Sequence, residues 1–417
     1  MASNLNFQKL QTKTGIPVYV MPLPHAQSVA AGVFVKAGTR DEQWPKEAGL
    51  AHALEHMSFQ GTKSFPTSKD VSAYLEEIGG YHNAWTSSEG TFYHNRVPVT
   101  HKDRAFISLG EILNEPLIPQ EKIGTEMKNI IEELRMYMDN PDSFLSILNQ
   151  KFLFGDHPLG KNELGTIEAL SKFTRNHFLE FRKRYYHASN YTFIITGNIT
   201  PDEALAGFET NFPQADFQPA NNRLLIPLVE KPDRTYVHKK ELEQVHVALS
   251  APIGQGKEKP ARSIQIFTVM LSGGASFPLF QEVRDKRGLC YSIHAGTSRN
   301  SDVGEFSINI GTDPKRYQEA IDVSLDVVRE SKNDEPLLAK AKDMMLGSLA
   351  LQFEHTGGIL ESAAFSTLFD GQPKGYDELM KEIQEITIDD VTSAVDMYLK
   401  PEDMRKVLLV PNELEIK

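Results

Sequence analysis

The sequence predicts an α+β protein made of two related domains. A chain of 417 residues is longer than one hydrophobic core usually supports, so two domains of about 200 residues each are expected. The first half alternates strand-like runs, rich in β-branched residues, with segments of helical periodicity. The second half starts a similar order of elements again, which indicates a duplicated domain.

Composition restricts the classes of partner. The formal net charge is −12, and 40% hydrophobic with 24% charged residues is typical of a globular protein. Nucleic acid is not an expected partner because phosphate binding needs a basic surface, whereas an acidic protein favours basic peptides. No apolar run reaches membrane-spanning length, and Met1–Leu23 lacks the apolar core of a signal peptide. We therefore expect no membrane partner and a cytoplasmic location.

The first half reads in order as strands, helices and a hairpin. Capping by Thr67 and a closing Gly79-Gly80 pair delimit one helix. The turn residues Ser87–Gly90 connect two of the strands as a hairpin. Strands are expected at Val18–Met21, Ser28–Lys36, Tyr81–Thr86, Thr91–Val97 and Tyr191–Thr196, and helices between Pro45 and Gly61, from Thr67 to Gly79, at Gln120–Asn140 and at Pro201–Phe208.

The segment Gly49–Thr62 carries the chemistry of the first half. If this segment is helical, His52 and His56 project from one face, with Glu55 close by. Two imidazoles can hold one zinc ion, and the carboxylate is then free to take a proton from a water molecule at the metal. The order His-x-x-Glu-His is the inverted form of the commoner zinc-peptidase signature. The alternative is a surface helix with two solvated histidines, or with one of them satisfied in the core.

A third zinc ligand is expected downstream on a rigid element, because two protein ligands would hold the ion loosely. On the helix predicted at Gln120–Asn140, Glu126 and Glu133 lie together at the edge of one apolar stripe, whereas Glu132 points away from it. Glu133 is therefore the expected ligand, and Glu126 is a second carboxylate that could orient a histidine. The alternative is a pair of carboxylates at a helix border, which is common. The stripe consists of Ile123, Met127, Ile130, Ile131, Leu134 and Met138.

These residues together resemble the inverzincin peptidase family that includes pitrilysin, insulin-degrading enzyme and the mitochondrial processing peptidase. In that family a glutamate ligand follows the His-x-x-Glu-His helix after 76 residues, and 76 residues separate His56 from Glu133 here. The family also places an acidic residue seven positions before that ligand, where this chain has Glu126. The run from His52 to Pro66 is similar to the family's motif region well beyond the ligands.

The resemblance implies further site residues and an architecture. Asn83 and the backbone of Ala84, followed by Thr86, are similar to the family's substrate-binding hairpin and would hold an extended peptide at a strand edge. By resemblance, each domain is a mixed, largely antiparallel sheet packed with helices. Two such chains, or one fused chain of double length, would enclose a chamber. Because this chain has half that length, a homodimer is expected, or a heterodimer with a related chain.

Residues 216–233 read as a linker, because prolines and asparagines gather there. The expected domains are then a zinc-binding catalytic domain at 1–215 and a metal-free repeat domain at 234–417. The segment that corresponds to the zinc helix has no His and Glu pair, so a duplicated domain without its metal site is the simplest account. Strands are expected at Val245–Ala251, Tyr291–Gly296 and Glu305–Ile310, and helices at Ala261–Leu271, at Phe277–Lys286 and over most of Lys315–Leu399.

The run Phe280–Tyr291 resembles the family's other motif, in which an arginine and a tyrosine seven residues apart contact the bound peptide. Arg284 and Tyr291 match that motif. A guanidinium can donate to a substrate carbonyl and a phenol to the oxyanion of the tetrahedral intermediate, and in the expected dimer these groups would serve the zinc of the other subunit. Without the first motif, an ordinary amphipathic helix running into a strand would explain the same residues. The chain departs from the family at Phe277-Pro278, where relatives often carry a polar or basic residue.

The sequence therefore favours a zinc-dependent endopeptidase or oligopeptidase that acts on peptides inside a chamber formed by two chains. His52, His56 and Glu133 would hold zinc, and Glu55 would activate the water that attacks a peptide carbonyl. The rival hypothesis is a non-catalytic core or assembly subunit of the same fold, as some relatives in respiratory complexes are.

Overall fold

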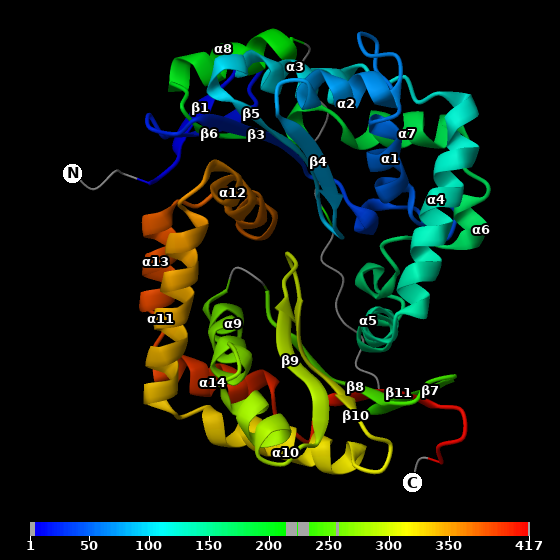
Figure 1. The fold of residues 1–417 in the computed structure, drawn as a ribbon, viewed down its shortest axis with the longest axis vertical. Helices are drawn as coiled ribbons and strands as arrows, with labels where there is room; N and C mark the ends of the chain where they lie inside the picture. Colours follow the sequence, from blue (N-terminus) through cyan, green and yellow to red (C-terminus); the bar gives the residue numbers. More distant parts are fainter. Residues whose placement is uncertain (1–4, 214–222, 224–232, 256–257, 416–417) are drawn as a thin grey trace. The chain divides into compact units, whose positions relative to one another are not determined.

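The computed structural model describes residues 5–213, 223, 233–255 and 258–415, which form two compact units, each around its own sheet (Figure 1). The first unit is built from residues within 1–134, 162–224 and 350–379, and the second from residues within 135–161, 225–349 and 380–417. The predicted linker, 216–233, lies almost entirely outside the described residues. The domain boundary drawn from the sequence therefore stays a prediction.

The first unit contains a six-stranded sheet in the order β1-β2-β6-β3-β5-β4. Neighbouring strands are antiparallel, except for the parallel pair β2 and β6. This mixed, largely antiparallel sheet confirms the predicted fold class. Its strands are β1 (Gln8–Gln11), β2 (Pro17–Pro22), β3 (Ser28–Val35), β4 (Tyr81–Thr86), β5 (Thr91–Pro98) and β6 (Tyr191–Gly197).

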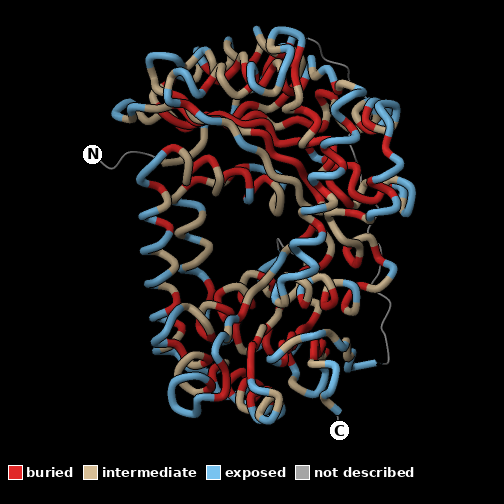
Figure 2. The backbone as a smooth tube through the Cα atoms, turned by 45° about the vertical axis from the view of Figure 1, so that its right-hand side comes forward, coloured by how far each residue is buried: buried red, intermediate tan, exposed pale blue. Residues whose placement is uncertain are grey.

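β3, in the interior of this sheet, is buried on both faces, which explains why it is an almost continuous apolar run (Figure 2). Val29 and Val33 belong to a core shared with α1, whereas Ala30 and Phe34 point to the other face and pack with Leu360 of α12. The helices of this unit are α1 (Leu50–Ser58), α2 (Ser68–Glu76), α3 (Asp103–Asn114), most of α4 (Gln120–Asp139), α6 (Ile167–Leu170), α7 (Arg175–Tyr185), α8 (Pro201–Asn211) and α12 (Thr356–Asp370).

The second unit repeats the topology of the first. Its five-stranded sheet has the order β7-β11-β8-β10-β9, and its one parallel pair, β11 with β7, corresponds to β6 with β2. The described residues thus confirm two related folds in one chain. The elements are α5 (Pro141–Phe154), β7 (Thr235–Lys240), β8 (Val245–Ile253), α9 (Lys259–Ser272), the π-helical segment η5 (Phe280–Asp285), β9 (Cys290–Ser298), β10 (Gly304–Thr312), α10 (Tyr317–Ser331), α11 (Glu335–Gln352), α13 (Tyr376–Gln384), α14 (Ile388–Tyr398) and β11 (Arg405–Pro411), with the ends of α11 and α13 reaching into the first unit.

Each sheet has one face covered by a helix from the other half of the sequence. In the first unit, α12 packs against β3 and β6. In the second unit, α5 packs against β8 and β11, which are the corresponding strands, and Leu145 and Leu148 of α5 share a buried cluster with Ala248 and Val407. The two repeats therefore exchange equivalent helices.

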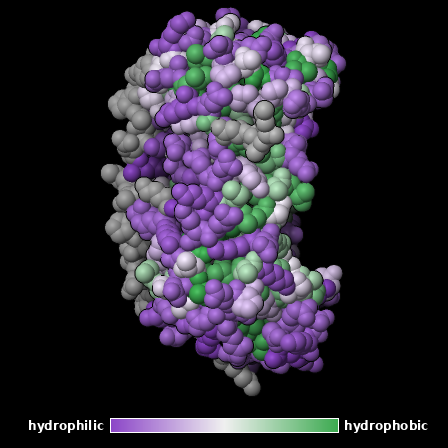
Figure 3. Space-filling view, turned by 90° about the vertical axis from the view of Figure 1, so that its left-hand side faces the viewer, coloured by the Kyte–Doolittle hydropathy of each residue, from purple (hydrophilic) through white to green (hydrophobic). Residues whose placement is uncertain are grey.

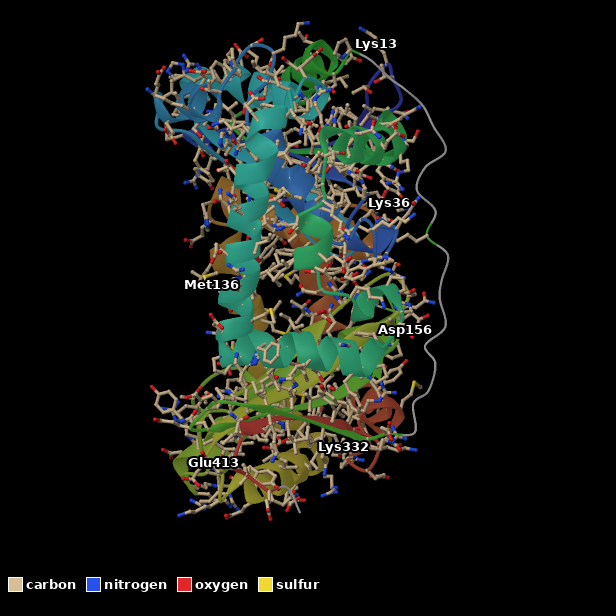
Figure 4. The ribbon with its side chains drawn as sticks, turned by 90° about the vertical axis from the view of Figure 1, so that its right-hand side faces the viewer. Lys13, Lys36, Met136, Asp156, Lys332 and Glu413 are labelled. Atoms are coloured by element: carbon tan, nitrogen blue, oxygen red, sulfur yellow. The ribbon has the colours of Figure 1, made fainter. Side chains whose placement is uncertain are left out.

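The helix α4 differs in its last turns from the sequence prediction. Of its predicted stripe, the residues up to Leu134 are buried, except Ile131, which is half-buried, but Met138 is 41% exposed. Met136, outside the stripe and labelled in Figure 4, is 62% exposed. The buried part of the stripe ends at Leu134 because residues from Arg135 onwards belong to the second unit and do not pack in the core of the first. The helix stops before Pro141, which opens α5 under an Asn140 cap.

No helix in the described part of the chain is long and apolar enough to cross a membrane. On the face shown in Figure 3, hydrophilic residues predominate at the surface.

Candidate metal centre

A buried carboxylate holds the first turn of α1. Glu42 accepts backbone hydrogen bonds from the N–H groups of Gly49 and Ala51, each 2.9 Å long, at the place where a helix leaves its donors unsatisfied. Burial raises the pKa of Glu42 well above the usual value for a glutamate. Gly49 has a φ of 87°, which favours glycine, and a Cβ there would lie 2.6 Å from the carbonyl oxygen of Leu164. These contacts define where α1 begins.

The helix α1 presents His52 and His56 on one face, and α4 brings Glu133 to the same point. The Oε2 atom of Glu133 lies 3.9 Å from Nε2 of His52 and 4.0 Å from Nε2 of His56. One ligand atom from each of the three residues lies within 4.8 Å of the others. Two imidazole nitrogens and a carboxylate oxygen are a donor set that binds zinc in catalytic sites, where a fourth position stays open. The predicted metal group is therefore assembled in the structure.

The electrostatics of the group suit a metal ligand. Burial and the neighbouring His56 lower the pKa of His52 to about 4, so at neutral pH this imidazole is uncharged, as metal binding requires. The other ring nitrogen of His56, Nδ1, lies 3.7 Å from Oε2 of Glu126. That distance is longer than a hydrogen bond, but it places Glu126 on the side of the ring where an orienting carboxylate was predicted.

Glu55 lies beside the metal group and is held by β4. The hydroxyl of Thr86 donates a 2.5 Å hydrogen bond to Oε2 of Glu55. Burial raises the pKa of Glu55, and the hydrogen bond from Thr86 opposes that rise. A buried carboxylate with a raised pKa next to a metal group has the properties of a general base.

Buried charges hold the hairpin that follows Thr86. Arg40 and Glu89 form an ion pair whose side chains are both 2% exposed. Arg223 donates hydrogen bonds of 3.0 and 2.6 Å to the carboxylate of Asp41, and one of 2.6 Å to the backbone carbonyl of Glu89. Removing one partner of a buried ion pair is strongly destabilising, so this network keeps the β4–β5 turn in one position.

The strand β4 is an edge of its sheet, which leaves backbone groups open to a further strand. The exposed Asn83 accepts, through its own Oδ1, a 2.9 Å hydrogen bond from the N–H of Ala84. The two residues expected to bind peptide are therefore bonded to each other. A peptide strand would have to replace this bond to reach the N–H of Ala84.

Arg284 and Tyr291 lie together, in the other compact unit from the metal group. The guanidinium carbon of Arg284 is 5.4 Å from the ring centre of Tyr291 and 4.8 Å from that of Phe280. Tyr291 is 75% exposed at the start of β9. Arg284 belongs to the π-helical segment η5, a type of turn that is frequent at functional sites.

Comparison with known proteins identifies the family. Residues 18–166 match the description "Insulinase (Peptidase family M16)", and residues 172–345 match "Peptidase M16 inactive domain". An uncharacterized zinc protease of Streptomyces coelicolor is 30% identical over 386 residues, which cover 90% of this chain and 84% of that protein. The chain belongs to peptidase family M16.

Further similar proteins cover nearly the whole length of the chain. The uncharacterized zinc protease YmxG of Bacillus subtilis is 29% identical over 406 residues, covering 96% of this chain and 97% of that one. A peptidase M16 inactive domain from Pseudomonas fluorescens has the same fold, with a TM-score of 0.89, 20% identity and 99% of both chains covered. A protease from Helicobacter pylori gives a TM-score of 0.85 at 20% identity, covering 97% of this chain and 99% of that one. The family resemblance drawn from the sequence is confirmed.

Two contacts in this M16 site were not predicted from the sequence: the hydrogen bond from Thr86 to Glu55, and the hydrogen bonds that Glu42 accepts at the start of α1. Thr86 could have been found from the strand alternation, because Ala84 and Thr86 share one face of β4 and Asn83 lies on the other. Glu42 carries no comparable signal. Nothing in local spacing connects a carboxylate with N–H groups seven and nine residues later.

Glu133 is expected to be needed for tight zinc binding. Glu133→Gln should weaken zinc binding roughly tenfold or more, because it removes the ligand charge from α4. Zinc bound per chain, measured by mass spectrometry of the metal after dialysis, would show the loss. Glu132→Gln, at the exposed neighbouring position, is the matched control and should keep its zinc. Full zinc retention by Glu133→Gln would remove Glu133 from the ligand set.

Proposed function

We propose that this chain is a zinc-dependent endopeptidase or oligopeptidase that cleaves extended peptides. The observation that carries the proposal is the meeting of His52, His56 and Glu133 in one metal-binding group, with Glu55 beside it. Membership of family M16 and the naming of relatives as zinc proteases support the same activity.

Each side chain has one role in the proposed reaction. His52, His56 and Glu133 hold zinc, which when bound polarises a peptide carbonyl and makes a water more acidic. Glu55 accepts the proton of the attacking water and can later give it to the leaving amine. Thr86 orients the Glu55 carboxylate through the hydrogen bond that it donates.

The peptide is proposed to bind as an additional strand on the edge of β4. Backbone hydrogen bonds would supply affinity, and alternate side chains would point to the two faces of the sheet. Asn83 and the backbone of Ala84 would release their mutual bond and turn to the peptide. An extended conformation is therefore required of the substrate, whereas the backbone contacts leave its sequence open.

We further propose a chamber formed by two chains, in which Arg284 and Tyr291 of one subunit donate to the peptide bound at the metal group of the other. The length of a relative supports this. The periplasmic protease PqqL of Escherichia coli matches 99% of this chain with a TM-score of 0.79 at 20% identity, but only 48% of PqqL is covered. A homodimer, or a pairing with a related chain, would reach about the length of the single PqqL chain. The cytoplasmic location stays a prediction.

The second candidate is a non-catalytic core or assembly subunit. The description "Peptidase M16 inactive domain" matches residues 172–345, which contain none of the metal-group residues. The peptidase is favoured because the half that matches the insulinase description keeps the three-residue metal group and Glu55.

The proposed function predicts cleavage that depends on Glu55. Zinc-loaded wild-type protein should cleave a quenched peptide library, and Glu55→Gln should be about 10²- to 10⁴-fold slower, because the amide cannot accept the proton. Both proteins should contain equal zinc, and Glu132→Gln is the surface control with wild-type activity. A wild-type protein that carries full zinc and leaves the library intact would favour the assembly subunit.

The Thr86 contact predicts a change in the pH profile. Thr86→Val removes the hydrogen bond that stabilises the ionised form of Glu55, so the pKa of Glu55 rises and the base is protonated over more of the pH range. The acidic limb of kcat/KM should move to higher pH, and kcat/KM at neutral pH should fall roughly tenfold. Thr86→Ser keeps the donor and should restore the wild-type profile. An unchanged acidic limb in Thr86→Val would exclude this orienting role.

Sharing of residues between subunits predicts complementation. In a mixed dimer of Glu55→Gln and Tyr291→Phe chains, one metal group has both its own Glu55 and a partner phenol. Such dimers should recover about half of the wild-type activity, although each variant alone is nearly inactive. Separately tagged chains, purified for both tags, allow the measurement. Verified mixed dimers without activity would contradict sharing in trans.

A further inference from the structure

A cavity of about 370 Å³ lies inside the first unit, between the sheet and the start of α12. The strands contribute Ala30, Tyr81, His94 and Arg96 to its wall, and the segment that leads into α12 contributes His355 and the Gly357-Gly358 pair. Its volume is within the range of small-ligand sites. The proposed hydrolytic mechanism makes no use of it.

Arg96 is the basic group of this cavity. The guanidinium carbon lies 5.1 Å from the ring centre of Tyr81, which is its pairing partner across β5 and β4. The guanidinium thus lies against the Tyr81 ring, and guanidinium N–H groups that no protein acceptor uses can donate to a ligand. Among the described residues, Arg96 has no carboxylate or carbonyl that accepts these donors. A half-buried guanidinium without an acceptor leaves a place for an anionic partner.

The start of α12 brings further donors to the same place. Its first turn has no side-chain cap, and the N–H groups of Gly357 and Gly358 have no acceptor in the described part of the chain. A Cβ on Gly357 would lie 3.4 Å from Nη1 of Arg96 and 3.8 Å from the hydroxyl of Tyr81. The missing side chain thus lets the guanidinium and the helix terminus, both of which attract anions, reach one ligand.

Besides Arg96 and Tyr81, the wall includes the titratable side chains of His94, His355 and Glu361. Neither His94 nor Glu361 neutralises Arg96. Burial and the neighbouring His82 lower the pKa of His94 to about 4, so His94 is uncharged at neutral pH. Glu361 lines the cavity from the second turn of α12. In the described structure, it forms no ion pair with Arg96.

The cavity lies along the edge strand that is proposed to bind the peptide. Tyr81 and Asn83 share one face of β4, and Tyr81 is five residues from Thr86, which contacts Glu55. At about 3.3 Å per residue, that is roughly 17 Å. A peptide that pairs antiparallel with β4 runs from Thr86 towards Tyr81, so the residues after the cleaved bond reach the cavity.

We propose that this cavity is a subsite for a carboxylate of the bound peptide. The carboxylate comes either from an Asp or Glu side chain about four to six residues after the cleaved bond, or from the C-terminus of a short peptide. Arg96 donates to it in the plane of the guanidinium, as arginine does to carboxylates. The inference rests on the proposed peptidase function. Because the net charge of −12 disfavours acidic peptides in general, the preference is confined to this position.

Binding to the Glu55→Gln protein tests the subsite without catalysis. Fluorescent peptides that carry Glu or Gln at each position in turn, with a free or an amidated C-terminus, are titrated by fluorescence anisotropy. One carboxylate should tighten binding about tenfold, and the gain should shrink with added salt. A gain from Glu at one position identifies a side chain as the source, and a gain from the free acid identifies the C-terminus. Equal affinities throughout, or no binding at all, would overturn the subsite.

Variants of Arg96 and Gly357 test whether the gain in affinity from a carboxylate arises in the cavity. Arg96→Gln should bring the affinity ratio of acidic to neutral peptide close to one. Gly357→Ala, a mild change in a helix, should lower the ratio by placing a methyl group against Arg96. Lys9→Gln is the matched control, because it removes one charge from β1 at the opposite edge of the sheet, where Lys9 lies 5.6 Å from the ring centre of Tyr19. An equal loss in Lys9→Gln would show a general charge effect and overturn the proposal.

The outcomes separate the subsite from the peptidase proposal. Cleavage by zinc-loaded wild-type protein without any carboxylate-dependent binding would leave the peptidase standing and remove the subsite. Carboxylate-dependent binding that is lost in Arg96→Gln, in a protein that cleaves nothing, would keep the subsite as a peptide-binding feature and remove the peptidase.

Discussion

The candidate metal centre depends on the fixed position of α1. Two histidines four residues apart can share an ion with a glutamate from another helix only if the rotation and start of their own helix are defined. The buried Glu42 carboxylate defines the start through its two backbone hydrogen bonds. Leu50 and Leu54, which are fully buried, define the rotation. With the start and the rotation of α1 defined, His52 and His56 face α4.

A second constraint comes from charges buried under the β4–β5 hairpin. Ionised groups removed from water are tolerated when they are paired and hydrogen-bonded, and Arg40 with Glu89 and Arg223 with Asp41 meet that condition. These ion pairs fix the position of the hairpin. The hairpin they hold carries Thr86 to Glu55 from one side while α1 carries Glu55 from the other, which is the kind of support that a preorganised site needs.

Duplication explains how the two halves can differ in chemistry while they share a fold. The strand orders correspond, yet α9, which follows β8 as α1 follows β3, contains neither histidine nor glutamate. Because α5 and α12 each pack on the sheet of the other half of the sequence, each half depends on the other for part of its core. The face of the first sheet that carries Ala30, Phe34 and Phe92 is buried only because Leu360 and its neighbours come from the second half of the sequence. The cavity beside Arg96 exists for the same reason.

Local rules in the sequence predicted many of the helices and strands and, together with the family spacing, the three residues of the metal group. Period-two runs and turn residues marked the strands, helical spacing put His52 and His56 on one face, and the wheel of α4 separated Glu133 from Glu132. Only the tertiary structure decided that Met138 is exposed, that Glu42 caps α1, that Asn83 bonds to Ala84, and that α12 covers the first sheet. The physical reason is that periodicity reports which face of an element is apolar and which groups share a face. It does not report which distant segment supplies the contact, because that depends on chain packing over the whole molecule.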